Sequence, residues 1–213
     1  MHSQAPVRAQ PGACPSGGEP RHRLEGQPHH DAVALAGRAV AERKSALAAR
    51  KPVEQPGVPF PVTEDEAQVA DSIRKAFAGV VLGKGVGLWQ AQAIDDYATP
   101  EQQQIARLHD EQRDWERISS ADLNRCHSSL SFFDAEGMRF HLPAFLLADL
   151  EGTFLFDVVF ALTYATDHNR ARFASLSPAQ RESVRGFLRL RRASEFDRPA
   201  IDAAIAEYWG DTG

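Results

Sequence analysis

The sequence has few of the features that mark secreted, membrane-spanning or zinc-binding proteins. It contains two cysteines in 213 residues, Cys14 and Cys126, which excludes a disulfide framework and a zinc site built from paired CxxC motifs. No apolar run approaches the roughly 20 residues that cross a membrane. The N-terminus also lacks the apolar segment of a secretory signal. We therefore expect a cytoplasmic protein that does not associate with membranes.

Charge is unevenly divided along the chain. Residues 1–62 carry eight Lys or Arg against five Asp or Glu, whereas residues 63–213 carry sixteen against twenty-four. An acidic domain repels the phosphate backbone of nucleic acids. We therefore expect no nucleic-acid partner, and a basic or amphipathic protein is the partner that this charge favours.

The composition divides the chain into an arm and one domain. Residues 1–28 are rich in Pro, Gly and Gln and are predicted to be disordered, because they cannot bury enough apolar surface to offset their ordering entropy. Residues 31–50 predict a marginal Ala-rich helix, and the four prolines of residues 51–62 indicate a linker. Residues 63–213 have the length of one ordinary domain.

Helix start signals recur through this domain. Thr63 and Glu66 form a capping-box pattern, and Thr99 and Ser177 each precede a proline at the first helical position. Apolar residues follow these signals at helical spacing. A second helix is predicted from Leu88 to about Ala98. The third is predicted to extend from Pro100 with one face marked by Ile105, Leu108, Gln112, Trp115 and Ile118.

Residues 129–142 allow two interpretations. Apolar and polar residues alternate on either side of a four-residue turn, which indicates a β-hairpin. Alternatively, Asp134 caps a helix, Pro143 kinks or splits it, and its buried face consists of Met138, Leu142, Phe145 and Leu146. We favour the helix because a lone hairpin is marginal in water. The predicted fold is mainly α, a compact single-domain bundle of six or seven helices.

The segment LNRCHSSLSFFDAEGMRFHLPAFLLADLEG resembles an uncharacterised bacterial family known only as a domain of unknown function. LGKGVGLWQAQAIDDY and SLSPAQRESVRGFL extend the resemblance, which covers residues 63–192. It implies a shared domain and a helix start within FFDAEGMRF. It implies no activity, and no catalytic residue carries over.

A glycine-rich loop is the first candidate binding site. Gly83, Lys84, Gly85 and Gly87 follow a short apolar run and precede a helix, where backbone N–H groups can bind phosphate. The GxGxG spacing matches neither GxxxxGK[ST] nor GxGxxG, and a tight connection between helices explains the glycines equally well. We therefore expect no cofactor.

Titratable residues of the central segment are the candidates for chemistry. Cys126 could be a nucleophile if a distant base such as His141 activated it, but a buried structural cysteine is far more common. His141 and Asp149 lie eight residues apart, near one helix face, and could bind a metal; Asp134 and Glu136 could join an acid–base cluster with His141.

Two functions follow from these patterns. The leading hypothesis is a non-enzymatic accessory protein, of an immunity-like or regulatory kind, that binds a basic or amphipathic protein. The alternative is a small hydrolase or metal-dependent enzyme that uses His141, Asp134, Glu136 and Cys126. A converging polar pocket would favour the enzyme, and an exposed apolar or acidic face would favour the binding protein.

Overall fold

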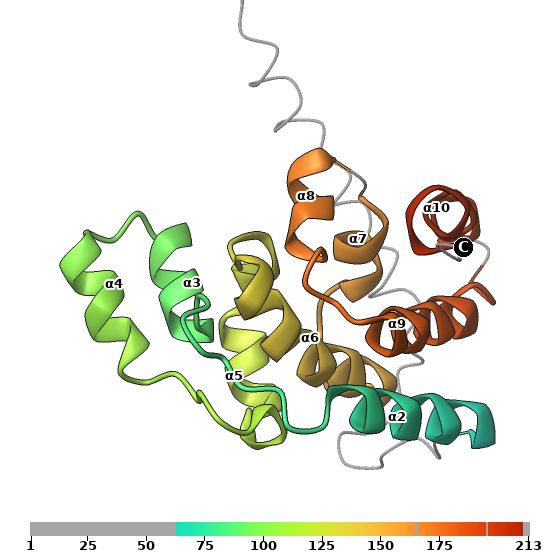
Figure 1. Ribbon diagram of the computed structural model, residues 1–213, viewed down its shortest axis with the longest axis horizontal. Coiled ribbons are helices and arrows are strands. Elements are labelled where there is room, and N and C mark those ends of the chain that lie inside the picture. The colour runs from blue at the N-terminus through green and yellow to red at the C-terminus, as the bar shows by residue number, and fades with distance from the viewer. Residues whose placement is uncertain (1–62, 165, 195, 211–213) are drawn as a thin grey trace, which may run out of the picture. The chain divides into compact units, whose positions relative to one another are not determined.

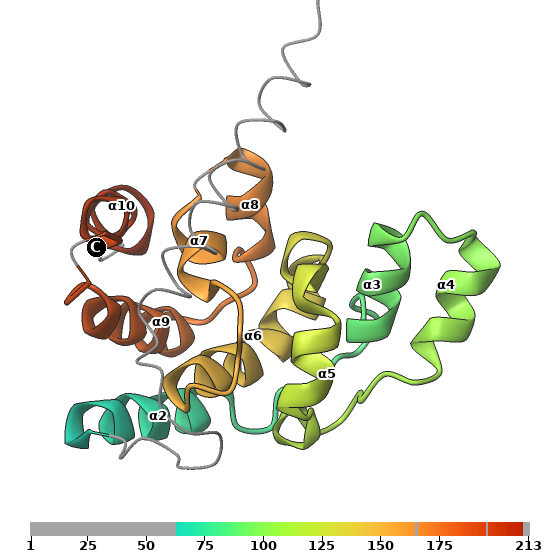
Figure 2. The ribbon, with the colours of Figure 1, turned by 180° about the vertical axis from the view of Figure 1, so that it is seen from behind.

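The computed structural model describes residues 63–164, 166–194 and 196–210. Within these ranges the chain forms nine α-helices and no strand (Figures 1 and 2). The mainly helical class is therefore confirmed, with more helices than the six or seven predicted. The predicted arm and linker, residues 1–62, lie outside the described residues. None of the described helices is long and apolar enough to cross a membrane.

The helices are short, apart from three of fourteen to sixteen residues. In chain order they are α2 (Glu64–Phe77), α3 (Leu88–Asp95), α4 (Pro100–Arg107), α5 (Ser120–Arg125), α6 (Ala135–Leu150), α7 (Val158–Thr163), α8 (Asp167–Arg172), α9 (Pro178–Arg191) and α10 (Arg198–Ala204). Two 3₁₀ turns, Trp115–Arg117 and His127–Ser131, flank α5, and a π turn, Ile205–Trp209, follows α10.

Helix α6 is the centre of the core. Twelve of its sixteen residues are buried, as is typical of a helix covered on all sides. It contacts α2, α5, α7 and α8, while α3 and α4 lie to one side of it and α7 to α10 to the other (Figures 1 and 2). Arg191 of α9 secures its C-terminal end by donating from Nε to Asp149 Oδ2 (2.7 Å) and from Nη2 to the Asp149 carbonyl (2.9 Å).

The hairpin interpretation of residues 129–142 is wrong. This segment forms a 3₁₀ turn and the first half of α6, and Asp134 Oδ1 accepts the Gly137 N–H at 2.8 Å, as the helix interpretation predicted. Pro143 does not split the helix, which is continuous from Ala135 to Leu150. The helix prevails because it buries apolar side chains on every face, which a two-stranded hairpin without a sheet partner cannot do.

The second and third helices are shorter than predicted. Helix α3 ends at Asp95 rather than near Ala98, because Tyr97 adopts a left-handed conformation with φ of +56°. Helix α4 ends at Arg107, and the predicted face does not continue to Ile118. The carboxylate of Glu111 accepts the backbone N–H groups of residues 112–114 at 2.9–3.3 Å, which turns the chain away from the helical path.

Candidate functional site

The glycine loop packs directly on the first turn of α6. Asp134 Oδ1 accepts the Val86 N–H at 3.0 Å as well as that of Gly137. A Cβ on Gly85 would lie 2.8 Å from the Glu136 carbonyl carbon, and one on Gly137 would overlap the Val86 carbonyl oxygen. Both glycines are therefore required by the approach of one backbone to another.

Arg107, at the end of α4, donates hydrogen bonds to carbonyl groups of the same loop. Its guanidinium donates to the carbonyls of Gly83 (3.1 Å) and Gly85, and to Gln90 Oε1 at 2.8 Å. The Gly85 N–H donates to the Leu82 carbonyl at 3.0 Å. The Val86 N–H is bonded to Asp134, so two N–H groups and two carbonyls of the loop are used within the protein. Lys84 is left exposed.

The first turn of α3 is capped by a distant carboxylate. Gly87 occupies the N-cap position without a side chain, and Asp110 Oδ1 accepts the Trp89 N–H at 2.6 Å. A Cβ on Gly87 would overlap the Asp110 carboxylate. Asp110 is thus an N-cap supplied from outside the helix, where a negative charge is favourable. The sequence contains no local sign of this role.

Asp110 is buried, with 8% of its surface exposed. Its Oδ2 has no hydrogen-bond partner among the described residues. Burial raises the pKa of Asp110 to about 6, although the N–H groups of Trp89 and Gln90 oppose the shift. This titratable group was not among the candidates that the sequence suggested.

A hollow of about 260 Å³ lies beside Asp110. The side chains of Glu111, Asp122 and Trp89 also line it, and Arg117 at its edge lies 3.9 Å from Glu111. His109 completes the charged and polar lining, and Arg125 lies over the Trp89 ring at 5.7 Å from its centroid. Two arginines of the chain itself therefore already lie beside the carboxylates and the aromatic ring of this hollow.

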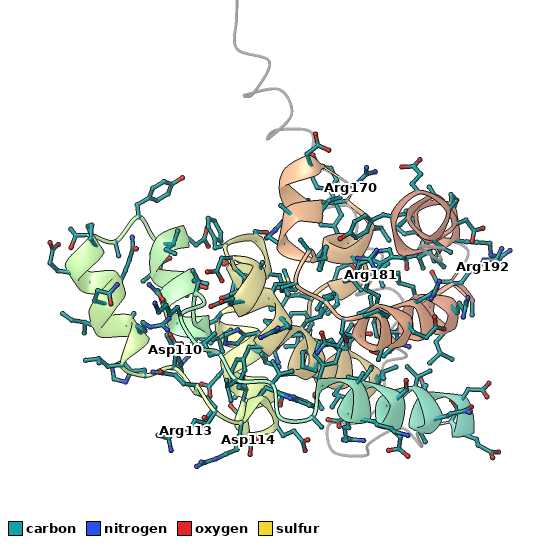
Figure 3. All side chains as sticks on the ribbon, in the orientation of Figure 1. Asp110, Arg113, Asp114, Arg170, Arg181 and Arg192 are labelled. Atoms are coloured by element: carbon teal, nitrogen blue, oxygen red, sulfur yellow. The ribbon has the colours of Figure 1, made fainter. Side chains whose placement is uncertain are left out.

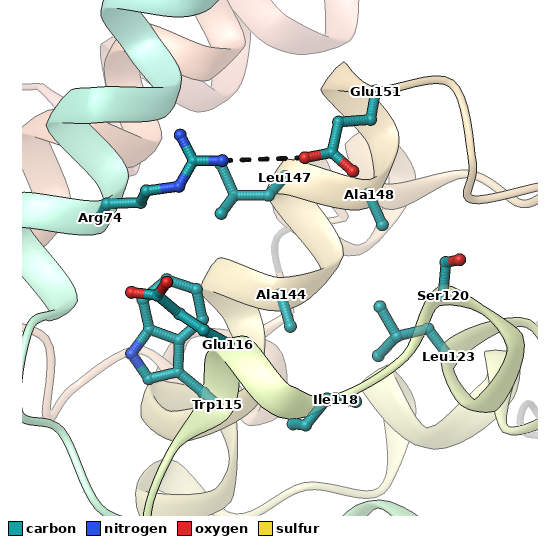
Figure 4. Close-up of a pocket in the computed structure, with 10 residues that line it drawn as sticks. All are labelled: Arg74, Trp115, Glu116, Ile118, Ser120, Leu123, Ala144, Leu147, Ala148 and Glu151. Atoms are coloured by element: carbon teal, nitrogen blue, oxygen red, sulfur yellow. Dashed lines mark ion pairs between the residues drawn. The ribbon is translucent and has the colours of Figure 1, made fainter. Parts of the chain in front are cut away.

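A second hollow, of about 180 Å³, lies between α2, α5 and α6 (Figure 4). Its lining includes Trp115 and Leu147, and Arg74 pairs with Glu151 at 3.7 Å beside it. Because its apolar residues belong to the core or pack against it, we assign it no chemistry.

The candidate nucleophile Cys126 is fully buried. Burial raises the pKa of its thiol to about 12, and the charges of Asp122 and Asp110 add to the shift. The neighbouring His127 is exposed and stacks on Phe156 at 3.8 Å between ring centroids. This environment suits a structural thiol rather than a reactive thiolate.

His141 has a structural environment as well. It is fully buried, its Nδ1 contacts the Gly137 carbonyl at 2.8 Å, and its ring stacks on Phe133 at 4.4 Å. Burial lowers its pKa to about 4, so the imidazole is neutral at pH 7. Asp149 instead pairs with Arg191.

The remaining candidates are both exposed: Asp134 is the N-cap of α6 and Glu136 lies in its first turn, where acids complement the helix dipole. In the part of the chain that the structure describes, no group of three or more His, Cys, Asp or Glu side chains could hold a metal ion.

A family model with the description "Family of unknown function (DUF6714)" matches residues 65–212. The chain belongs to the DUF6714 family. This confirms the resemblance to a domain of unknown function, and it assigns no activity to the DUF6714 domain. Searches of curated proteins and of solved structures gave no match.

The close approach of the glycine loop to the backbone of α6 in this DUF6714 domain can be tested by replacing glycines within helices. Helix propensity alone predicts that Gly→Ala stabilises a helix by about 1 kcal/mol. Gly186→Ala in α9 should do so, because its Cβ would meet only Val69 Cγ2 at 3.8 Å. Gly137→Ala should instead destabilise the domain by about 1–3 kcal/mol, because it forces the loop away from α6. Urea unfolding measures both, and equal stabilisation by the two variants would contradict the account.

The burial of Asp110 predicts a specific pH dependence. A carboxyl whose pKa is raised from 3.8 to about 6 contributes stability that is present below pH 4 and lost as the pH rises through 6. Asp110→Asn removes this loss and keeps an oxygen for the Trp89 N–H. The stability of the variant relative to the parent should rise by about 2 kcal/mol between pH 4 and pH 7. Urea unfolding across this range measures the difference, and a constant difference would show that Asp110 titrates normally.

Proposed function

We propose that this domain functions by binding another protein of basic or amphipathic character. The observation that carries the proposal is that α4 buries none of its own residues, so this helix adds no side chain to the core. Its end nevertheless exposes Ile105 (59%) and Leu108 (80%), one turn apart. Exposed apolar side chains gathered on one element are typical of partner surfaces.

The distribution of charge supports a basic partner. Between Leu88 and Glu111 the chain has five carboxylates and one arginine, Arg107, which is bonded to the glycine loop. The labelled arginines of the other side, Arg170, Arg181 and Arg192, lie among α8, α9 and α10 (Figure 3). These three contact acidic or aromatic groups of the same region, namely Glu207, Tyr208 and Asp202. The α3–α4 side has its own arginines, Arg113 (Figure 3), Arg117 and Arg125. Its charge is nevertheless negative on balance, because residues 84–125 carry eight Asp or Glu against five Lys or Arg.

The four residues of the enzymatic alternative line neither of the two hollows. These residues either cap α6, lie exposed in its first turn or are buried in the core. The raised pKa keeps the thiol of Cys126 protonated at neutral pH, and the lowered pKa makes the imidazole of His141 a weak base. We also propose a cytoplasmic location, because the free, buried thiol of Cys126 fits a reducing compartment.

Carbodiimide crosslinking in lysates of the source cells tests the proposal. This zero-length reagent joins a carboxylate to an amine only when the two are in contact. We expect products that join Asp or Glu of residues 63–213 to lysines of one basic partner. They should be lost in about 1 M salt, where exposed ion pairs are screened. Products confined to this chain would contradict the proposal.

A further inference from the structure

We infer that the exposed face of α4, together with Tyr97, docks a basic amphipathic helix of the partner. This inference rests on the proposed function and names its surface. We call the surface formed by Glu101, Ile105 and Leu108 the α4 face; Tyr97 lies two residues before Thr99, the N-cap of this helix. Glu101, Ile105 and Leu108 follow one another at intervals of four and three residues, which places them on one side of the helix.

Tyr97 occupies a position that normally favours glycine. It directly follows the C-cap of α3, where the Ala98 N–H donates to the Ala93 carbonyl (2.9 Å) and the Tyr97 N–H to the Ile94 carbonyl (3.1 Å). This is the Schellman pattern, whose left-handed residue is usually Gly. A bulky side chain with φ of +56° is strained there, and this one is 95% exposed. Folding does not explain a tyrosine at this position, whereas contact with a partner does.

Charge selects the occupant of the α4 face. Glu101 lies on the face itself, Asp95 and Asp96 lie just before Tyr97, and the hollow with its three carboxylates begins at His109, directly after Leu108. An amphipathic helix with lysines or arginines beside an apolar stripe complements both the exposed apolar side chains and the carboxylates of this surface. A second copy of this chain would bring the same carboxylates against each other, so the occupant is a basic partner and not a dimer mate.

The test uses the full chain and a fluorescently labelled synthetic helix of leucine and lysine, about 18 residues or five turns long. A peptide with glutamate in place of lysine is the charge control. Binding is measured by fluorescence anisotropy for the parent, Ile105→Gln/Leu108→Gln, Tyr97→Gly and Leu155→Gln. Leu155 is 55% exposed in the segment between α6 and α7, so it provides a matched control for loss of exposed apolar surface.

We expect the lysine peptide to bind the parent and Leu155→Gln equally, and to bind the double variant and Tyr97→Gly at least about tenfold more weakly. Tyr97→Gly should also raise the melting temperature, because glycine relieves the left-handed strain. A gain in stability together with a loss of binding separates a docking role from a structural one.

The outcomes distinguish the inference from the proposed function. If the lysine peptide binds every variant as tightly as the parent, the α4 face is not the docking surface, while binding of a basic partner stands. If the parent binds neither peptide, or binds the glutamate peptide as tightly, the proposed function fails together with the inference.

Discussion

The buried carboxylate of Asp110 holds the α3–α4 hairpin in place. It caps α3 through the Trp89 N–H, fills the space that a side chain on Gly87 would occupy, and lies three residues after Arg107, which binds the glycine loop. Asp134 likewise caps α6, and one of its carboxylate oxygens accepts hydrogen bonds from N–H groups of its own helix and of the loop. Two carboxylates and one guanidinium thus fix the loop, α3, α4 and α6 relative to one another.

This arrangement has an electrostatic consequence. Helix N-termini attract anions, but at α3 an internal carboxylate already fills that role, and its burial raises the pKa of Asp110. Burial lowers the pKa of His141 in α6, so the stability that its neutral imidazole contributes to the fold is lost as the pH falls below 6.5. The two groups titrate with opposite effects on stability between pH 4 and 6.5, so they offset each other.

Helix starts could be predicted from the sequence because their signals are local. The Thr63 capping box, the Thr99 and Ser177 caps before proline, and the Asp134 cap all have their predicted partners within three residues. The end of α4 could not be predicted from the sequence, because the helical spacing of apolar residues continues past Arg107, whereas in the structure the Glu111 carboxylate turns the chain. A tight connection between helices is one of the two interpretations that the sequence allows for the glycines. The sequence does not show which residues they approach, because Gly87 depends on Asp110 and Gly85 on α6, about fifty residues away.

The Asp110 carboxylate can reach the first turn of α3 only because residue 87 is a glycine. A double-mutant cycle of Gly87→Ala and Asp110→Ala, followed by urea unfolding at pH 7, tests this most directly. Each single variant should lose the cap, and removal of the carboxylate in the double variant relieves most of the overlap. The double variant should therefore be at least about 1 kcal/mol more stable than the sum of the single effects predicts. Additive effects would contradict the account.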